Sequence, residues 1–218
     1  MFRQYRPLER GEFFVVAGDT SSGGLDYSAC IFLSKTRLDV PLIYHSNSTT
    51  AYMTDAIAPV LERISDFTGV QPIVAYETNN GGSFELERLA HLNKAGKFRM
   101  YMQKAGVGTI ENPSSKKYGW TTSSATRPAM LQDLKEAIDN QLIRIYDKHL
   151  INEMFSFVIN QTSTSWRAQA ESGAHDDLIM ALSIAWQMYQ TEIPTQSGKG
   201  NYNKYVARNQ TRDTDIGF

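Results

Sequence analysis

EFFVVAGDTSSGGLDYSACIFLS (residues 12–34) consists of two short apolar runs on either side of a turn rich in Gly and Ser. The first run, residues 12–18, is rich in β-branched and aromatic side chains, which is typical of a buried strand. Asp19 stands where this run ends and the turn begins. Residues 27–34 predict a second strand, so the chain opens as strand, turn and strand.

The segments that follow alternate between strand and helix patterns. Residues 40–45 predict a third strand, which makes the opening a three-stranded meander. Apolar residues recur at helical spacing in residues 49–68, and Gly69 is placed to end that helix. Later patterns predict strands at 72–76, 98–103 and 142–146, helices at 83–93, 124–140, 148–158 and 175–191, and a hairpin at 162–168. We expect Ser83 to cap its helix. This order predicts an α/β fold, a mixed β-sheet flanked by helices.

The composition indicates a folded chain and excludes several classes of protein. The 218 residues are 41% hydrophobic and 21% charged, which is ordinary for a globular protein. Lys and Arg number 22 against 23 Asp and Glu, so nucleic-acid binding would need a local basic patch. The single cysteine, Cys30, cannot form an internal disulfide. The sequence has neither a membrane-length apolar stretch nor a Walker A loop, so we expect an intracellular protein without ATPase activity of that type.

The domain boundaries follow from changes in composition along the chain. We predict an N-terminal extension at residues 1–11 and one folded domain at residues 12–192. Residues 193–218 are polar, rich in Gly, Asn, Gln and Thr, and predict a tail that is disordered or ordered by a partner.

Acidic residues follow two of the predicted strands and open the last predicted helix. Asp19 ends the first strand, Glu77 follows the strand at 72–76, and Asp176 and Asp177 start the helix. Adjacent strand ends meet at one edge of an α/β sheet, and a helix packed across that edge adds further carboxylates. Converging carboxylates repel one another unless a divalent cation lies between them. Oxygen ligands favour Mg²⁺ or Mn²⁺, and no His/Cys set has the spacing of a zinc site.

Each of these acidic residues also has a simpler explanation. Asp19 has the position of an ordinary turn residue, and Asp176 and Asp177 have the position of side chains that complement the helix dipole. Glu77 fits such an explanation poorly, because it lies between an apolar strand and the turn TNNGG. The joint pattern therefore favours a metal site.

Helical geometry distinguishes the two adjacent aspartates. At about 100° per residue, Asp177 lies on the apolar side with Ala181, and Asp176 on the more polar side with Ser183. We therefore predict that Asp177 contacts the metal directly and that Asp176 is a second ligand or holds a second ion. His175 is either a neighbour of the helix cap or a group that protonates the leaving oxygen or contacts a phosphate.

Four motifs in sequence order resemble the nuclease domain of phage large terminases, a domain with a ribonuclease H-like fold. They are GDTSSGGLDYSA, a strand ending in YETNNGG, GWTTSSATRPAML and GAHDDLIMALSIAW, and the similarity covers residues 13 to 189. The resemblance implies a ribonuclease H-like mixed sheet flanked by helices. It also implies that Asp19, Glu77, Asp176 and Asp177 are the acidic metal ligands, with Asp26 as a further acidic position near the site.

The same resemblance implies an activity and a set of partners. It implies a two-metal-ion endonuclease that uses Mg²⁺ or Mn²⁺ to cleave double-stranded DNA during viral genome packaging in the host cytoplasm. Large terminases carry an N-terminal ATPase domain, which we do not find here, so we expect the nuclease part alone, as a monomer. The expected partners are DNA, the ATPase domain, the portal and the small terminase subunit, and no membrane.

Basic residues gather between Arg99 and Arg127. The cations there are Arg99, Lys104, Lys116, Lys117 and Arg127, against the single acid Glu111. A local positive excess suits a surface that follows phosphates, so we predict DNA contacts at Lys104, Lys116, Lys117 and Arg127. A solvated charged loop is the alternative.

Other functions fit parts of this sequence. A Holliday-junction resolvase or a transposase-like nuclease would share the fold and the carboxylates. An actin-like or sugar-kinase-like phosphotransferase would use the DTSSGG turn to hold phosphate, but it needs a second phosphate loop and an adenosine pocket. A non-catalytic docking module with structural carboxylates is the remaining alternative.

Overall fold

The computed structural model describes residues 1–21, 27–103, 118–161, 166–170 and 175–196. Within them, seven strands form one mixed sheet. These strands are β1 (Phe2–Gln4), β2 (Phe14–Asp19), β3 (Ser28–Ser34), β4 (Asp39–Ser46), β6 (Ile73–Tyr76), β7 (Arg99–Met100) and β8 (Arg144–Ile145). Their order is β1-β4-β3-β2-β6-β7, and β8 also pairs with β4.

The strand directions place two carboxyl ends side by side. Strands β2, β3 and β4 pair antiparallel, which confirms the predicted meander, and β6 pairs parallel to β2. In the β2–β6 register Gly18 lies opposite Tyr76. The residues that follow them, Asp19 and Glu77, therefore lie at the same edge of the sheet. We call this edge, formed by Asp19 and Glu77, the acidic edge.

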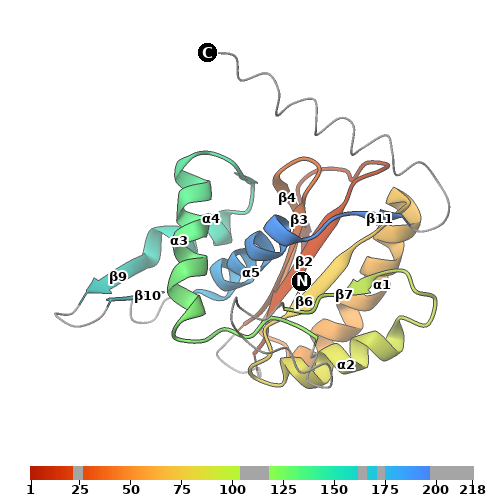
Figure 1. Cartoon of the computed structure of the whole chain (residues 1–218), viewed down its shortest axis with the longest axis horizontal. Helices are drawn as coiled ribbons and strands as arrows, with labels where there is room; N and C mark the ends of the chain where they lie inside the picture. Colours follow the sequence, from red (N-terminus) through yellow and green to blue (C-terminus); the bar gives the residue numbers. More distant parts are fainter. Residues whose placement is uncertain (22–26, 104–117, 162–165, 171–174, 197–218) are drawn as a thin grey trace, which may run out of the picture.

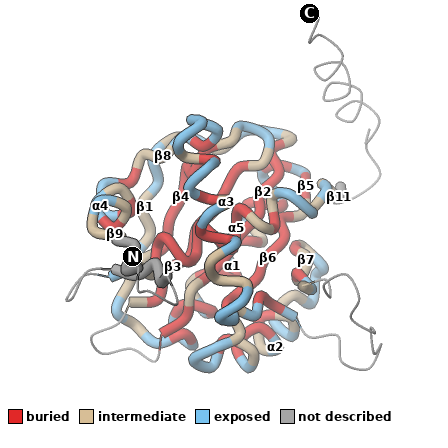
Figure 2. Tube along the Cα trace, turned by 60° about the vertical axis from the view of Figure 1, so that its left-hand side comes forward, coloured by how far each residue is buried: buried red, intermediate tan, exposed pale blue. Residues whose placement is uncertain are grey.

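Helices cover both faces of the sheet (Figure 1). Helices α1 (Thr50–Thr68) and α2 (Gly82–Leu92) lie on one face, and α3 (Thr126–Asp139), α4 (Lys148–Ser156) and α5 (Asp177–Thr191) lie on the other. Because successive strand residues point to opposite faces, Val16 joins the core under α1 while Val15 and Ala17 join the core under α5. The central strands are therefore buried on both sides (Figure 2), which explains their continuous apolar sequence.

Several predicted boundaries differ from the structure. Ser83 is not the cap of α2: Gly81, with φ of 84°, precedes the helix, and the Ser83 hydroxyl donates to the Thr78 carbonyl. The predicted strand at 98–103 is reduced to β7. The predicted helix at 148–158 ends at Ser156, and the chain continues as β9 (Phe157–Gln161), which pairs with β10 (Trp166–Ala170) in a hairpin.

The two ends of the described chain also pair with strands. β1 lies beside β4, and β11 (Thr195–Gln196), at the start of the segment predicted as a polar tail, pairs with β5 (Val70–Gln71). No helix in the described part of the chain combines the length and apolarity needed to cross a membrane.

A buried carboxylate connects β1 to α4. The Asp147 side chain accepts a hydrogen bond from the Leu150 N–H at 2.8 Å and so caps α4. The same carboxylate accepts from Arg3 Nε at 2.5 Å and from the Tyr5 hydroxyl. These bonds hold the first residues of the chain against the helix that carries Glu153.

We expect Asp147→Ala to lower the free energy of unfolding by about 2–4 kcal/mol, because it removes a helix cap and leaves Arg3 without its partner. Urea denaturation measures the change. Asp139→Ala is the matched control, since it breaks only the exposed pair with Lys135 and should cost less than about 0.5 kcal/mol. Equal losses in both variants would contradict the structural role of Asp147.

Candidate metal centre

Asp19 and Glu77 lie next to each other at the acidic edge. The Glu77 N–H donates to the Gly18 carbonyl at 2.7 Å, which extends the β2–β6 pairing by one residue. The carboxyl groups of Asp19 and Glu77 are hydrogen-bonded to each other. Among the described residues neither carboxyl has a basic partner. The structure thus brings together the two strand-end acids that the sequence singled out.

Tight packing of the following turn fixes the backbone around Glu77. The Thr20 hydroxyl donates to the Asn79 carbonyl at 2.8 Å, and Asn80 Nδ2 donates to the Thr20 carbonyl at 3.1 Å. A Cβ atom at Gly82 would lie 1.8 Å from the Glu77 carbonyl oxygen, so only glycine fits there. The Gly-rich sequence after β6 therefore holds the Glu77 backbone against the turn after β2.

The start of α5 brings two more carboxylates to this edge. Helix α5 packs on β2 and β3, and the charges of Asp177 and Asp176 both act on Asp19. The pKa of Asp19 lies well above its ordinary value, mainly because the group is buried and next because Glu77 repels its charge and shares a hydrogen bond with it. A divalent cation among these oxygens would relieve this repulsion, so the residues fit such an ion.

The two adjacent aspartates have different surroundings. The Asp176 carboxylate binds Arg127, with Nη2 2.7 Å from Oδ2. The Asp177 side chain is only 16% exposed and lies nearer to the other carboxylates, since its effect on Asp19 is the larger of the two. Helix α5 begins at Asp177, with Asp176 as its N-cap. The prediction that Ser183 lies on a polar side of α5 is wrong. Ser183 is fully buried, because α3 and α4 cover the helix.

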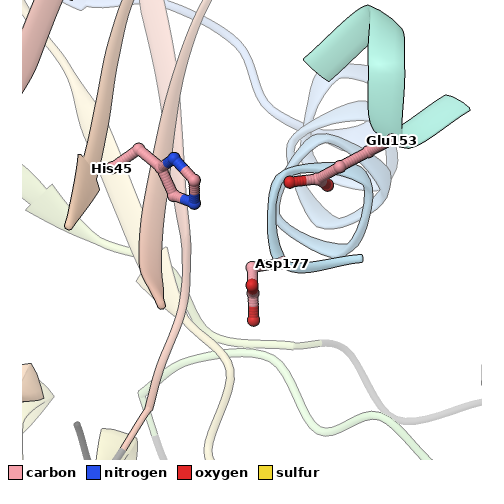
Figure 3. Close-up of side chains that lie close together, drawn as sticks. All are labelled: His45, Glu153 and Asp177. Carbon is pink, nitrogen blue, oxygen red and sulfur yellow. The ribbon is translucent and has the colours of Figure 1, made fainter. Parts of the chain in front are cut away.

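Sequence reasoning missed two residues beside Asp177. One ligand atom each from His45, Glu153 and Asp177 lies within 4.8 Å of the others, a grouping that can hold a metal ion (Figure 3). The His45 imidazole has a pKa lowered to about 4, mainly by burial and then by the charge of Arg3. His45 ends a predicted strand, so the strand-end argument applied to Asp19 would have found it. Glu153 lies inside a helix and carries no such signal.

Glu153 makes contacts that belong to α5. Its Oε2 accepts hydrogen bonds from the Leu178 N–H at 2.9 Å and the Ile179 N–H at 3.2 Å. Burial raises the pKa of Glu153 to about 8, and the negative charges of Asp177 and Asp176 add to the rise. The carboxyl group is thus both a helix cap and a neighbour of Asp177.

The remaining predicted residues are distributed as follows. His175 is 44% exposed, with Nδ1 3.7 Å from Asp177 Oδ2, so it borders the centre. Arg127 borders it through Asp176. Arg99 instead lies at the opposite edge, where it pairs with Glu192 at 3.5 Å. The predictions for Asp26, Lys104, Lys116 and Lys117 lie outside the described residues.

The sheet order and its covering helices define the class: this is the ribonuclease H-like fold found in nuclease domains of terminases. No protein-family model matches the sequence, and a comparison with curated proteins found no match. Among solved structures, the large terminase nuclease of the thermophilic phage G20c with bound cobalt has 19% identity and a TM-score of 0.59 over 84% of each chain.

Two further terminase nuclease domains are similar in structure. That of Thermus phage P74-26 has 19% identity and a TM-score of 0.58, covering 92% of this chain and 87% of the other. That of human cytomegalovirus, soaked with manganese, has 12% identity and a TM-score of 0.54, covering 82% and 84%. At these identities the likeness establishes the fold, and it confirms the fold that the four motifs predicted.

We expect the metal-free protein to lose stability as the pH rises from about 6.5 to about 8. Below pH 6.5 the lowered pKa of His45 acts in the opposite direction, because the unfolded state then binds a proton that the buried imidazole does not. The ordinary carboxyl pKa of Glu153 is 4.5 and its folded value is about 8. Between these values the folded state keeps a proton that the unfolded state has released, so the free energy of unfolding falls with rising pH, by up to about 1.4 kcal/mol per unit. The raised pKa of Asp19 acts in the same direction.

Urea denaturation in EDTA at several pH values measures this dependence. Glu153→Gln should make it shallower, whereas the exposed Glu87→Gln should leave it unchanged. Stability that increases over this pH range would contradict the burial of these carboxyl groups.

Proposed function

We propose that this chain is the nuclease part of a viral large terminase, a metal-dependent endonuclease that cleaves double-stranded DNA during genome packaging. The convergence of Asp19, Glu77 and Asp177 at one edge of a ribonuclease H-like sheet carries the proposal. Separate structures of the G20c domain with bound cobalt and with bound magnesium, and the cytomegalovirus domain soaked with manganese, support a divalent metal in this fold.

The residues of the acidic edge would hold Mg²⁺ or Mn²⁺. Divalent ions bound there supply the chemistry of phosphodiester hydrolysis, because they lower the pKa of a water and stabilise the leaving oxygen. Asp19, Glu77 and Asp177 would provide the first set of oxygens, and Asp176 would serve on the flank as the ligand of a second ion. His175, which lies beside Asp177, would donate a proton to the leaving oxygen.

DNA would reach this edge from the side of Arg127. The Arg127 guanidinium is partly exposed and lies beside Asp176, where it can also bind a backbone phosphate near the ions. Lys104, Lys116 and Lys117 would continue the contact along the strand. The ATPase domain, the portal and the small subunit remain the proposed partners.

The structural alternative explains the acidic edge less well. A purely structural carboxylate is normally stabilised by a cation or by several N–H donors. The pKa of Asp19 is instead raised by burial and by three acidic neighbours, which favours a function for the group over a docking role. The similar structures named above are terminase nucleases, which favours this activity over a resolvase or a kinase.

We expect Asp19→Asn to abolish Mn²⁺-dependent nicking of a supercoiled plasmid, with a loss of about 100-fold or more. The amide keeps the shape but removes the charge that holds the cation. Asp55→Asn, an exposed change on α1, is the control and should keep full activity. Normal nicking by Asp19→Asn that EDTA still abolishes would rule out this metal site.

The paired aspartates should respond differently to metal concentration. We expect Asp177→Asn to be inactive at every Mn²⁺ concentration, because it removes a central ligand. Asp176→Asn should keep activity that increases with added Mn²⁺, since a weakened flanking ligand raises the dissociation constant of the ion. A Mn²⁺ titration of plasmid nicking compares them, and the reverse ranking would exchange the two roles.

A further inference from the structure

The N-terminus of α5 is capped in an unusual way. The N–H groups of Leu178 and Ile179 are the second and third of the helix, which the side chain of the N-cap residue ordinarily satisfies. The N-cap residue here is Asp176, a residue type well suited to that task, yet its side chain makes no capping hydrogen bond. Its carboxylate binds Arg127 at 2.7 Å instead.

Glu153 provides the missing cap from another helix. One oxygen, Oε2, accepts from both N–H groups, at 2.9 and 3.2 Å, and the residue is only 8% exposed. Helix α4 is itself fixed, because Asp147 caps it and the fully buried Leu150 anchors it in the core. The acceptor is therefore held firmly against the start of α5.

This exchange of partners affects the acidic edge directly. Unsatisfied N–H groups at a helix start attract the carboxylate of the N-cap residue, which would turn Asp176 back over its own helix. With Glu153 on those groups, the Asp176 side chain is not needed as the cap and can lie beside Arg127, close enough for its charge to act on Asp19. Figure 3 shows Glu153 reaching this turn of α5 beside Asp177.

We propose that Glu153 is a positioning residue of the metal centre, which caps α5 in place of Asp176 and so keeps both aspartates directed at the acidic edge. This inference rests on the proposed function. It assigns Glu153 the role of a hydrogen-bond acceptor that contacts neither metal nor DNA. A hydrogen-bond acceptor at this position needs an oxygen but no charge, whereas a metal ligand needs the negative charge. The two roles therefore predict different effects of substituting Glu153.

Two substitutions of similar size separate these roles. Glu153→Gln keeps an oxygen that accepts both hydrogen bonds, whereas Glu153→Leu keeps the bulk and removes the acceptor. We expect the Gln variant to bind Mn²⁺ within about threefold of the unchanged protein. We expect the Leu variant to bind Mn²⁺ about 10–100-fold more weakly, as is usual when a group that orients a metal ligand is lost. Calorimetric titration with Mn²⁺ alone, without DNA, measures both.

A destabilised control separates positioning from simple loss of stability. Asp39→Asn weakens the buried pair with Arg6 at the opposite end of β4, so it should lower the free energy of unfolding and leave Mn²⁺ affinity unchanged. Hydrogen exchange of the Leu178 and Ile179 amides gives a second measurement. Exchange should stay slow in the Gln variant and become faster in the Leu variant.

The outcomes are distinct. Weak Mn²⁺ binding in both Glu153 variants would make Glu153 a ligand and overturn the proposal, as would normal binding in the Leu variant. If the Leu variant does not fold, Glu153→Asp replaces it, because its carboxylate is one methylene too short to reach both N–H groups. If the protein without any substitution neither binds Mn²⁺ nor nicks DNA, the proposed function itself is wrong, and both inferences are overturned.

Discussion

Repulsion between buried carboxylates at the ends of β2 and β6 is the constraint on which the site depends. Burial raises the pKa of Asp19, and the charges of three other acids around it raise that pKa further. Such an arrangement is unfavourable unless rigid contacts hold it and a cation compensates its charge. The tight turn at Gly82, the pairing of Asp176 with Arg127 and the cap from Glu153 are the contacts that hold it here.

The parts of the site that follow from local sequence were predictable. Asp19 and Glu77 each stand directly after an apolar strand, and parallel neighbouring strands must bring such residues to one edge. The start of α5 was equally clear, because a long apolar helix opens with two aspartates. The continuous apolar sequence of β2 also indicated burial on both faces, which the two cores confirm.

The parts that depend on contacts between distant segments were not predictable. Glu153 is one polar residue in an amphipathic helix, and nothing nearby in sequence shows that it caps a helix 25 residues later. The pairing of Asp176 with Arg127 was unpredictable for the same reason, because the two residues are 49 positions apart in the sequence. The sequence pattern around Arg127 indicated DNA binding alone. Ser83 shows the opposite error, where a residue with good capping chemistry was displaced by the backbone geometry of Gly81.

The position of α5 in the chain determines when the metal centre can be complete. Asp19 lies in an early strand, whereas Asp177 opens the last long helix, whose apolar side chains complete the core on one face of the sheet. The ribosome synthesises the chain from its N-terminus, and a domain folds as a unit. A partly synthesised chain therefore has the strand-end acids but neither aspartate of α5, so its metal centre is assembled only once the final helix has docked.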